Sequence, residues 1–246
     1  MQKTKYLLTA GIALALVVSA YLISIGIRHF QGGDPVVRVT GLSERHITSD
    51  LIILPIRITT LDKDQAKAYQ ALQSAKNKAM AFLQAQGLGT DEVSASSVAI
   101  TKDEAHHYNR STYAYESTTF NGYNLSMELT IRSSKVAVVE KISSTISELI
   151  SAGVSLSVRD ARYYYTKLNE LKSEMIKEAS SDAHARAQLI AEGGKKKLGD
   201  LKGTTLGVFQ VVGLYEDEAY SWGGSFNTKS KEKTISVTVK ASYIID

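Results

Sequence analysis

The chain has no cysteine, and this absence removes several classes of function at once. Without cysteine there is no disulfide, no thiolate metal site, no lipid-modified cysteine and no cysteine nucleophile. Only two prolines occur: Pro35 in a short linker and Pro55 inside an apolar segment. Histidine is also sparse, with five residues in 246, so a histidine-based metal site has few possible ligands.

An excess of basic residues is absent once the N-terminus is set aside. The formal net charge is +4, but Lys3, Lys5 and Arg28 flank an apolar N-terminal run, and 26 basic and 25 acidic residues remain beyond residue 29. Nucleic-acid binding needs a clustered basic face. The one dense cluster, residues 195–197, is typical of a helix C-terminus, where cations face the negative end of the dipole. We expect no nucleic-acid partner.

Motifs that carry chemistry are missing as well. His106 and His107 are adjacent, and neighbouring side chains on an extended chain point to opposite sides, so they do not readily chelate one ion. Residues 194–199 have the glycine spacing of a P-loop, but Asp200 and Leu201 replace the required Lys-Ser/Thr. We therefore expect no catalytic, metal-binding or cofactor-binding residues and no enzyme activity. One catalytic hypothesis remains. In it the protein is a hydrolase whose Ser, His and Asp residues come together only on folding, with His184 or His106 as the histidine.

The most informative feature present is the N-terminal run. Lys3 and Lys5 precede 22 residues without a charge, residues 6–27. A helix of that length is about 33 Å long and spans a bilayer core of about 30 Å. Residues 1–29 are therefore predicted to be a membrane anchor. The alternative is a signal peptide cleaved after the small-x-small site at residues 18–20, although cleavage there leaves an apolar run through Ile27 on the mature protein.

Orientation follows from the two lysines, which favour the cytoplasmic side. The prediction is a single-pass protein of the inner (plasma) membrane, with its C-terminal domain on the periplasmic side. If residues 1–20 are removed, the domain is secreted to the periplasm instead. Both interpretations place the domain outside the cytoplasm.

Residues 30–35 form a linker, and residues 36–246 carry patterns of both strand and helix. A period of two predicts strands, and apolar stripes at spacings of three and four predict helices. Pro55 cannot donate to a ladder, so its strand is expected at an edge or a bulge. Strands are predicted near 36–40, 50–60, 93–101, 120–132, 155–166, 204–214 and 234–245, and helices over 64–86, 134–152 and 168–192.

The order of these elements repeats. A strand-helix-strand-strand unit over residues 50–132 is followed by a second over residues 155–245, with the helix at 134–152 connecting them. Clean alternation over residues 123–132 favours antiparallel pairing with one buried face. The predicted fold class is α+β, with mainly antiparallel sheets.

Each unit contains a long polar stretch that carries aromatic residues, residues 103–119 and residues 215–233. Loops of this length are uncommon unless they are functional or disordered, and aromatic residues are enriched where proteins meet partners. The alternative is a pair of mobile hairpin arms with incidental tyrosines. The candidate oligomer or partner contacts are Tyr113, Tyr115, Tyr220, Trp222 and Phe226.

Several landmarks, in this order, resemble the SIMPL-domain family of bacterial envelope proteins over about residues 36–246. They are Val37-x-Val39-x-Gly41 followed by Asp50, a strand over 115–131 with a helix ending at Gly153, and Ala179-x-x-Asp182-Ala183-x-x-x-Ala187-x-x-Ile190-Ala191 followed by Leu198-Gly199.

The resemblance implies an α+β fold and an envelope location. Members of the family have been linked to defence against oxidative stress, and one assembles into a ring-like oligomer. The family offers no established catalytic residues. The leading hypothesis is a membrane-anchored, non-enzymatic protein that self-assembles. The alternative is a monomeric binding module for a small ligand or a partner protein.

Overall fold

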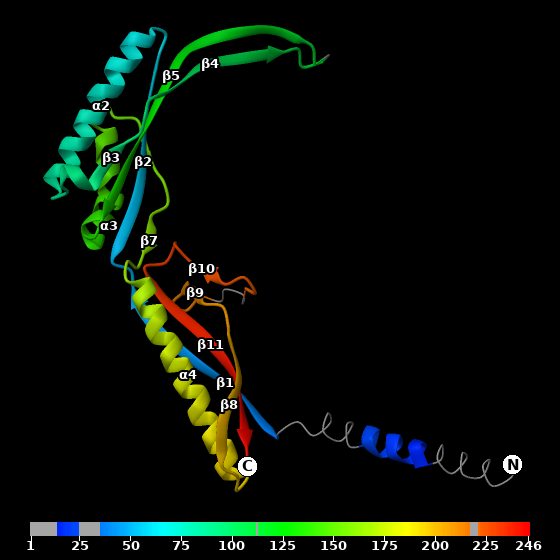
Figure 1. The fold of residues 1–246 in the computed structure, drawn as a ribbon. Coiled ribbons are helices and arrows are strands. Elements are labelled where there is room, and N and C mark those ends of the chain that lie inside the picture. Colours follow the sequence, from blue (N-terminus) through cyan, green and yellow to red (C-terminus); the bar gives the residue numbers. More distant parts are fainter. Residues whose placement is uncertain (1–13, 25–34, 112, 217–220) are drawn as a thin grey trace, which may run out of the picture. The chain divides into compact units, whose positions relative to one another are not determined.

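The computed structural model describes residues 14–24, 35–111, 113–216 and 221–246 (Figure 1). Residues 14–24 are helical. Within the described ranges no helix combines the length and the apolar character that crossing a bilayer requires. The span predicted for residues 6–27 extends at both ends into residues outside the described ranges, so it stays a prediction.

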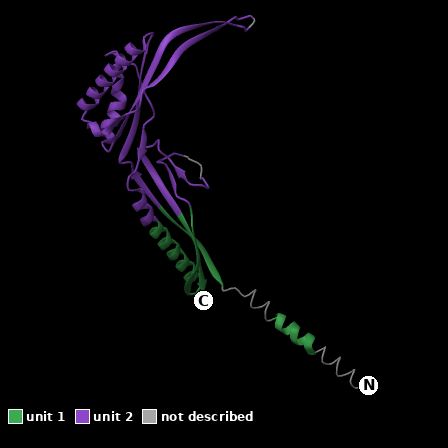
Figure 2. Cartoon of the chain, turned by 45° about the horizontal axis from the view of Figure 1, so that its top comes forward, with its two compact units in different colours: residues 1–43, 176–207, 238–246 green, residues 44–175, 208–237 purple. Residues whose placement is uncertain are grey.

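The chain divides into two compact units (Figure 2). Unit 1 comprises residues 1–43, 176–207 and 238–246, and unit 2 comprises residues 44–175 and 208–237. Three elements contribute residues to both units: strand β1 (Val36–Thr48), helix α4 (Leu168–Gly193) and strand β11 (Glu232–Ile245).

Unit 2 is built on a six-stranded antiparallel sheet. Its order is β3-β5-β2-β6, with β4 also pairing β5 and β7 also pairing β2. The strands are β2 (Leu51–Asp62), β3 (Val93–Ala95), β4 (Ala99–Tyr108), β5 (Tyr115–Ser133), β6 (Leu156–Val158) and β7 (Arg162–Tyr164). Ile52, Leu54, Ile56 and Ile58 of β2 are buried beside Leu125, Met127, Leu129 and Ile131 of β5. The alternation predicted for these two strands is confirmed.

Helix α2 (Gln65–Ala85) packs on the buried face of this sheet. Asp64 caps it by accepting from the backbone N–H groups of Ala66 and Lys67, at 2.8 and 3.3 Å. The helix stops at Gly87, whose φ of +92° is a left-handed conformation that favours glycine. Its buried residues are spaced three and four apart, the pattern that predicted the helix, and they run from Ala68 to Leu83. Phe82 is only partly buried.

A second helical segment follows β5. Helix α3 (Val136–Thr145) continues into the 3₁₀ helix η2 (Ile146–Ile150), and the chain leaves it at Gly153, with φ +79°. The helix predicted to begin at residue 134 begins two residues later, at Val136. The cap position is Lys135, which makes no side-chain capping hydrogen bond; its own backbone N–H donates to Ser133 Oγ at 2.9 Å.

The strand predicted over residues 155–166 is two short strands, β6 and β7, and Pro55 explains the interruption between them. Strand β2 is central, yet its second neighbour is split: β6 pairs with Ile56 to Ile58, and β7 pairs with Leu51 to Ile53. The Pro55 carbonyl accepts from Arg159 N at 2.9 Å, so the missing proline N–H faces the same gap. The proline therefore interrupts the partner strand instead of forcing β2 to the edge.

The other sheet has the order β1-β11-β9-β10, and β8 also pairs β11. Its remaining strands are β8 (Leu198–Leu206), β9 (Gln210–Gly213) and β10 (Ser225–Phe226), so the strand predicted at 204–214 is two strands. In unit 1, Val37, Val39, Ala241 and Tyr243 pack against Ala183 and Ala187 of α4. The buried alternation of β11 and the buried stripe of Ala179, Ala183 and Ala187 on α4 agree with the strand and the helix predicted there.

The fold is mixed α+β with mainly antiparallel sheets, as predicted; β9 and β10 pair in parallel. The predicted repeat needs a correction. Residues 155–166 were expected to open the second unit, but β6 and β7 pair with β2 in the first sheet. The second sheet takes β1, from the start of the domain, beside β11.

Candidate functional site

The stretch predicted between residues 103 and 119 is a two-stranded ribbon, not a loop. We call residues 103–122 the hairpin arm. Strand β2 pairs with β5 only from Tyr123 onward, so within the described strands the arm part of β5 pairs with β4 alone. Most arm side chains are exposed, and Figure 1 shows the ribbon continuing past α2. An isolated two-stranded ribbon is marginally stable in water, so this surface is available for a partner.

An aromatic cluster lies on the arm. Tyr108 and Tyr115 meet edge to face with ring centroids 6.0 Å apart, and the His106 ring lies 6.3 Å from Tyr115. Thr118 Oγ1 lies 2.7 Å from both His106 Nδ1 and Tyr115 Oη. We call His106, Tyr108 and Tyr115 the arm cluster. Its rings are held by these contacts while remaining exposed, as an interface anchor requires.

The turn at the tip of the arm is fixed by Asn109. Its backbone exchanges hydrogen bonds with Ala114 and Tyr113, both at 2.8 Å, and its side chain binds Ser111 N and Glu116 Oε1 at 2.9 and 2.8 Å. Tyr113 adopts φ +56°, an uncommon conformation for a non-glycine residue. Its side chain is 83% exposed. The candidate contacts Tyr113 and Tyr115 therefore lie at the same tip.

A bulge marks where the arm leaves the sheet. The register shifts between Asp103 and Glu104, opposite Gly122. A Cβ atom on Gly122 would lie 2.7 Å from the Asp62 carbonyl oxygen, so this position requires glycine. Phe120 packs edge to face on Tyr123 at 5.3 Å. A bulge increases the local twist and re-aims the strands beyond it.

The second aromatic stretch folds back onto the protein. Phe226 belongs to β10, which pairs with β9, and its ring lies 6.4 Å from Tyr164. Trp222 sits in the turn before β10 and is 89% exposed. Tyr220 lies outside the described residues. The five candidate contacts are thus divided between two separate segments of unit 2.

Hydrogen bonds hold the second aromatic stretch against itself and against β9. Gln210 Nε2 donates to the Ser221 carbonyl at 2.7 Å. Glu216 accepts from Asn227 Nδ2 at 3.0 Å and from the Ser230 hydroxyl. The hairpin arm is consequently the better candidate for an extended contact surface.

A buried lysine was missed by the sequence reasoning. Lys233 is 2% exposed, and its Nζ donates to Ser49 Oγ at 2.9 Å and to the carbonyls of Tyr163 (3.1 Å) and Ser230. Burial lowers the pKa of Lys233 to about 8, and the charge of Glu216 opposes that shift. The sequence did carry a signal for this burial. By the period of two, Lys233 lies on the same face of β11 as the buried residues Ile235 and Val237.

Beside Lys233, Glu140 binds two partners. Its carboxylate accepts from Lys231 Nζ at 2.9 Å and from Tyr163 Oη at 3.2 Å. Burial, followed by the charge and the hydrogen bond of Glu140, raises the pKa of the Tyr163 phenol. Together with Lys233 these contacts join β7, α3 and the start of β11, which is a structural role.

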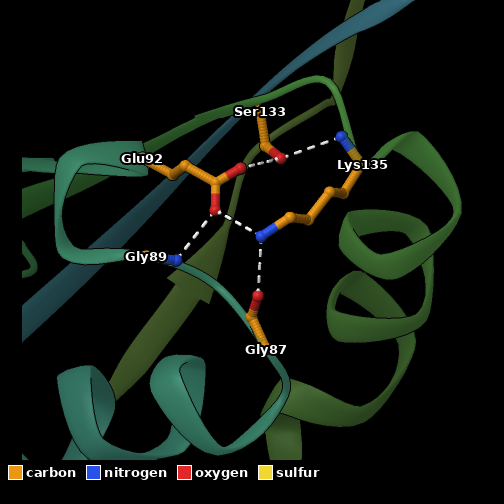
Figure 3. A network of polar contacts seen from close by, with 5 residues as sticks. All are labelled: Gly87, Gly89, Glu92, Ser133 and Lys135. Atoms are coloured by element: carbon orange, nitrogen blue, oxygen red, sulfur yellow. Dashed lines mark hydrogen bonds and ion pairs between the residues drawn. The ribbon is translucent and has the colours of Figure 1, made fainter.

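A further polar network joins the C-terminal end of α2 to the end of β5 (Figure 3). Glu92 accepts from Ser133 Oγ, the Gly89 N–H and Lys135 Nζ, at 2.5, 2.8 and 2.9 Å. Lys135 Nζ also donates to the Gly87 carbonyl at 2.9 Å. The hydrogen bond from Ser133, then those from Gly89 and Lys135, lower the pKa of Glu92 to about 2.

The histidines take part in individual contacts. His184 packs edge to face on Tyr243 at 5.6 Å, and His46 Nδ1 lies 3.1 Å from Thr234 Oγ1. His106 and His107 bind different threonines, Thr118 and Thr119. Among the described residues, no group of three or more His, Cys, Asp or Glu side chains is placed to hold a metal ion.

The sequence motifs that carried the family resemblance meet in unit 1 for reasons of packing. A Cβ atom on Gly41 would lie 2.1 Å from the Ala179 carbonyl oxygen and 2.4 Å from Ala183 N. Asp182 Oδ2 accepts from Leu42 N at 2.9 Å. That hydrogen bond and the one from Arg186 lower the pKa of Asp182. The glycine of the first motif and the small residues of the second are therefore two sides of one close contact.

Asp50, the last residue of the opening motif, has a separate local role in unit 2. Its carboxylate accepts from the backbone N–H and the hydroxyl of Thr166, both at 2.7 Å, just before α4 begins.

The chain was then compared with known proteins. No curated protein matches the chain. The family model for SIMPL, described as a protein of unknown function (DUF541), matches residues 37–243, which include both motifs and the hairpin arm. The chain therefore belongs to the SIMPL family.

Proposed function

We propose that this SIMPL-family protein is a membrane-anchored envelope protein that self-assembles through its hairpin arm and has no catalytic activity of its own. The observation that carries the proposal is the arm cluster, in which Tyr108 and Tyr115 are ordered against each other yet remain exposed. Large aromatic side chains dominate the binding energy of protein interfaces. Tyr108 and Tyr115 do not belong to the hydrophobic cluster around β2 and β5, so core packing does not explain their position on the ribbon.

The edges of the arm support the same conclusion. An unpaired strand edge is a template for pairing with another chain, and proteins usually cover or disrupt such edges. In the arm, β4 and the first part of β5 pair only with each other among the described strands. A second copy is the proposed partner, in keeping with the ring-forming member to which the family resemblance points.

The anchor completes the proposal. Residues 6–27 contain no charge and follow Lys3 and Lys5, which favours a single-pass protein with the SIMPL domain on the periplasmic side of the inner membrane. Cleavage that leaves a periplasmic protein is the alternative. A role in envelope stress defence is part of the proposal and comes from the family resemblance.

The test is the mass of the full-length chain, extracted with a neutral detergent from alkali-washed membranes and measured by light scattering after size exclusion. Recovery in the washed membranes tests the anchor. We expect a discrete multimer for the natural chain. In a Tyr108→Ser, Tyr113→Ser, Tyr115→Ser variant we expect a monomer, because the exposed aromatic contact area is removed.

The matched control is Tyr69→Ser, which removes an exposed tyrosine from α2. The control should keep the mass of the natural chain. A multimer of unchanged mass in the triple variant would show that assembly does not use the arm. A monomeric natural chain would sink self-assembly and favour the second candidate, a monomeric binding module.

A further inference from the structure

A cavity at the interrupted edge of β2 brings together three cations from two distant segments. Its volume is about 430 Å³, and it lies within unit 2. One side is the connection from β6 to β7, and the other is the turn before β11. The lining residues are Arg159, Asp160, Ala161, Arg162, Thr228 and Lys229.

Pro55 creates one side of this cavity. Pairing with β2 ends at Val158 and resumes at Arg162, because Pro55 has no N–H to offer in between. The three residues in the gap are held at one point, where Arg159 N donates to the Pro55 carbonyl at 2.9 Å. Arg159 is the first residue of this gap, and Arg162 is the first residue after it.

Hydrogen bonds fix the other side. Tyr163 N donates to the Thr228 carbonyl at 2.7 Å, which joins β7 to the turn. The side-chain oxygen of buried Asn227 accepts from Lys229 N and Ser230 N, both at 2.9 Å. Both sides of the cavity are therefore preformed, so a ligand would bind without first ordering the backbone.

The charge of the cavity is unbalanced. Lys231 pairs with Glu140 and Lys233 is buried, whereas Lys229, at the same spacing, lines the cavity. Within the described part of the chain, no carboxylate forms an ion pair with Lys229 or Arg162. Arg159 has a long contact, 3.6 Å from its Nε to Glu128 Oε2. Among the described lining residues, Asp160 is the single acid, against three bases.

We propose that this cavity binds the phosphoryl group of an anionic ligand through Arg159, Arg162 and Lys229. Guanidinium groups present paired donors that match phosphate oxygens, and a lysine adds a mobile point charge. This inference is independent of the anchor and of self-assembly.

Calorimetric titration of the full-length chain in a neutral detergent with inorganic pyrophosphate, at constant ionic strength, tests the proposal. We expect saturable binding that weakens at least about tenfold in Arg162→Gln, Lys229→Gln, the equivalent of about 1.4 kcal/mol. The matched control is Lys63→Gln, Lys141→Gln, which removes the same charge from exposed positions elsewhere in unit 2 and should bind as the natural chain does.

Two results would overturn the proposal: the absence of saturable binding up to about 10 mM pyrophosphate, or equal affinities for the two double variants. Repeating the titration in lipid discs distinguishes the source of the phosphoryl group. Competition by phosphatidylglycerol, with none by phosphatidylcholine, supports a lipid headgroup as the ligand. Equal affinity in both discs supports a soluble phosphoryl compound.

Discussion

A single buried amine illustrates how the fold of unit 2 holds its segments together. Lys233 donates only to neutral oxygens, from Ser49, Tyr163 and Ser230. Neutral acceptors satisfy its three protons but do not neutralise its charge, so burial favours the deprotonated amine and lowers the pKa of Lys233 to about 8. The side chain thus joins the β1–β2 turn to β7 at an electrostatic cost that depends on pH.

This cost predicts an unusual pH dependence of stability. Because the folded pKa of Lys233, about 8, is below the ordinary value of 10.5, the unfolded chain binds more protons between these values. Stability therefore rises with pH across that window, by up to about 3 kcal/mol if the full shift is expressed. Urea unfolding of the full chain in detergent, followed by circular dichroism at pH 7.5 and 9.5, measures the difference; the upper pH stays below the raised pKa of Tyr163.

The control is Lys233→Met, which should abolish the rise while costing about 1–3 kcal/mol at pH 7.5, because three oxygens lose their donor. An equal rise in the methionine variant would assign the effect to other groups.

At the scale of elements, one close contact in unit 1 joins a strand to a helix. Gly41 of β1 lies against α4, where a Cβ atom would meet Ala179 and Ala183 at distances that no packing tolerates. We expect Gly41→Ala to lower the free energy of unfolding by about 2–4 kcal/mol, because β1 must move away from the helix. Chemical denaturation measures the loss.

Gly193→Ala is the matched control, because its Cβ atom would contact nothing within 4 Å. A Gly41→Ala variant as stable as this control would contradict the close packing.

The elements also show what a single sequence can and cannot establish. Alternation predicted the buried faces of β2, β5 and β11, because burial imposes a period of two whichever strand lies alongside. It did not predict partners: residues 155–166 pair with β2, and β1 pairs beside β11. A strand's own residues define its faces, but its neighbours depend on the rest of the chain.

The same limit applies to the candidate site. The aromatic residues of the sequence pointed to Tyr113 and Tyr115. The pairing of Tyr108 with Tyr115, however, depends on a register shift at His107, and no local sequence pattern predicts that shift. Arg159, Arg162 and Lys229 are ordinary surface cations in sequence and gather only through the gap at Pro55.

For the molecule as a whole, the hairpin arm is separable from the core. Among the described residues, the hydrophobic cluster around β2 and β5 contains none from 99–122; its members from β5 begin at Tyr123, where pairing with β2 begins. Exposed ribbon residues contribute little to the free energy of folding, since burial of apolar area provides most of it. We therefore expect the arm to add exposed surface and little stability, in keeping with the partner contact proposed for it.

Deleting most of the arm is the decisive test at this scale. Replacing residues 105–119 with Asn-Gly joins Glu104 to its cross-strand partner Phe120 through a two-residue turn suited to an antiparallel pair. We expect the melting temperature of the full chain to change by less than about 3 °C, because no core contact is removed, and the multimer to be lost.

The two readouts separate the possible failures. A large fall in melting temperature would show that the arm supports the fold, and the loss of assembly would then follow from unfolding. An unchanged melting temperature with an unchanged mass would place assembly elsewhere, with Trp222 and Phe226 as the remaining aromatic candidates that the structure describes. Only unchanged stability together with a monomeric mass supports the arm as the contact surface.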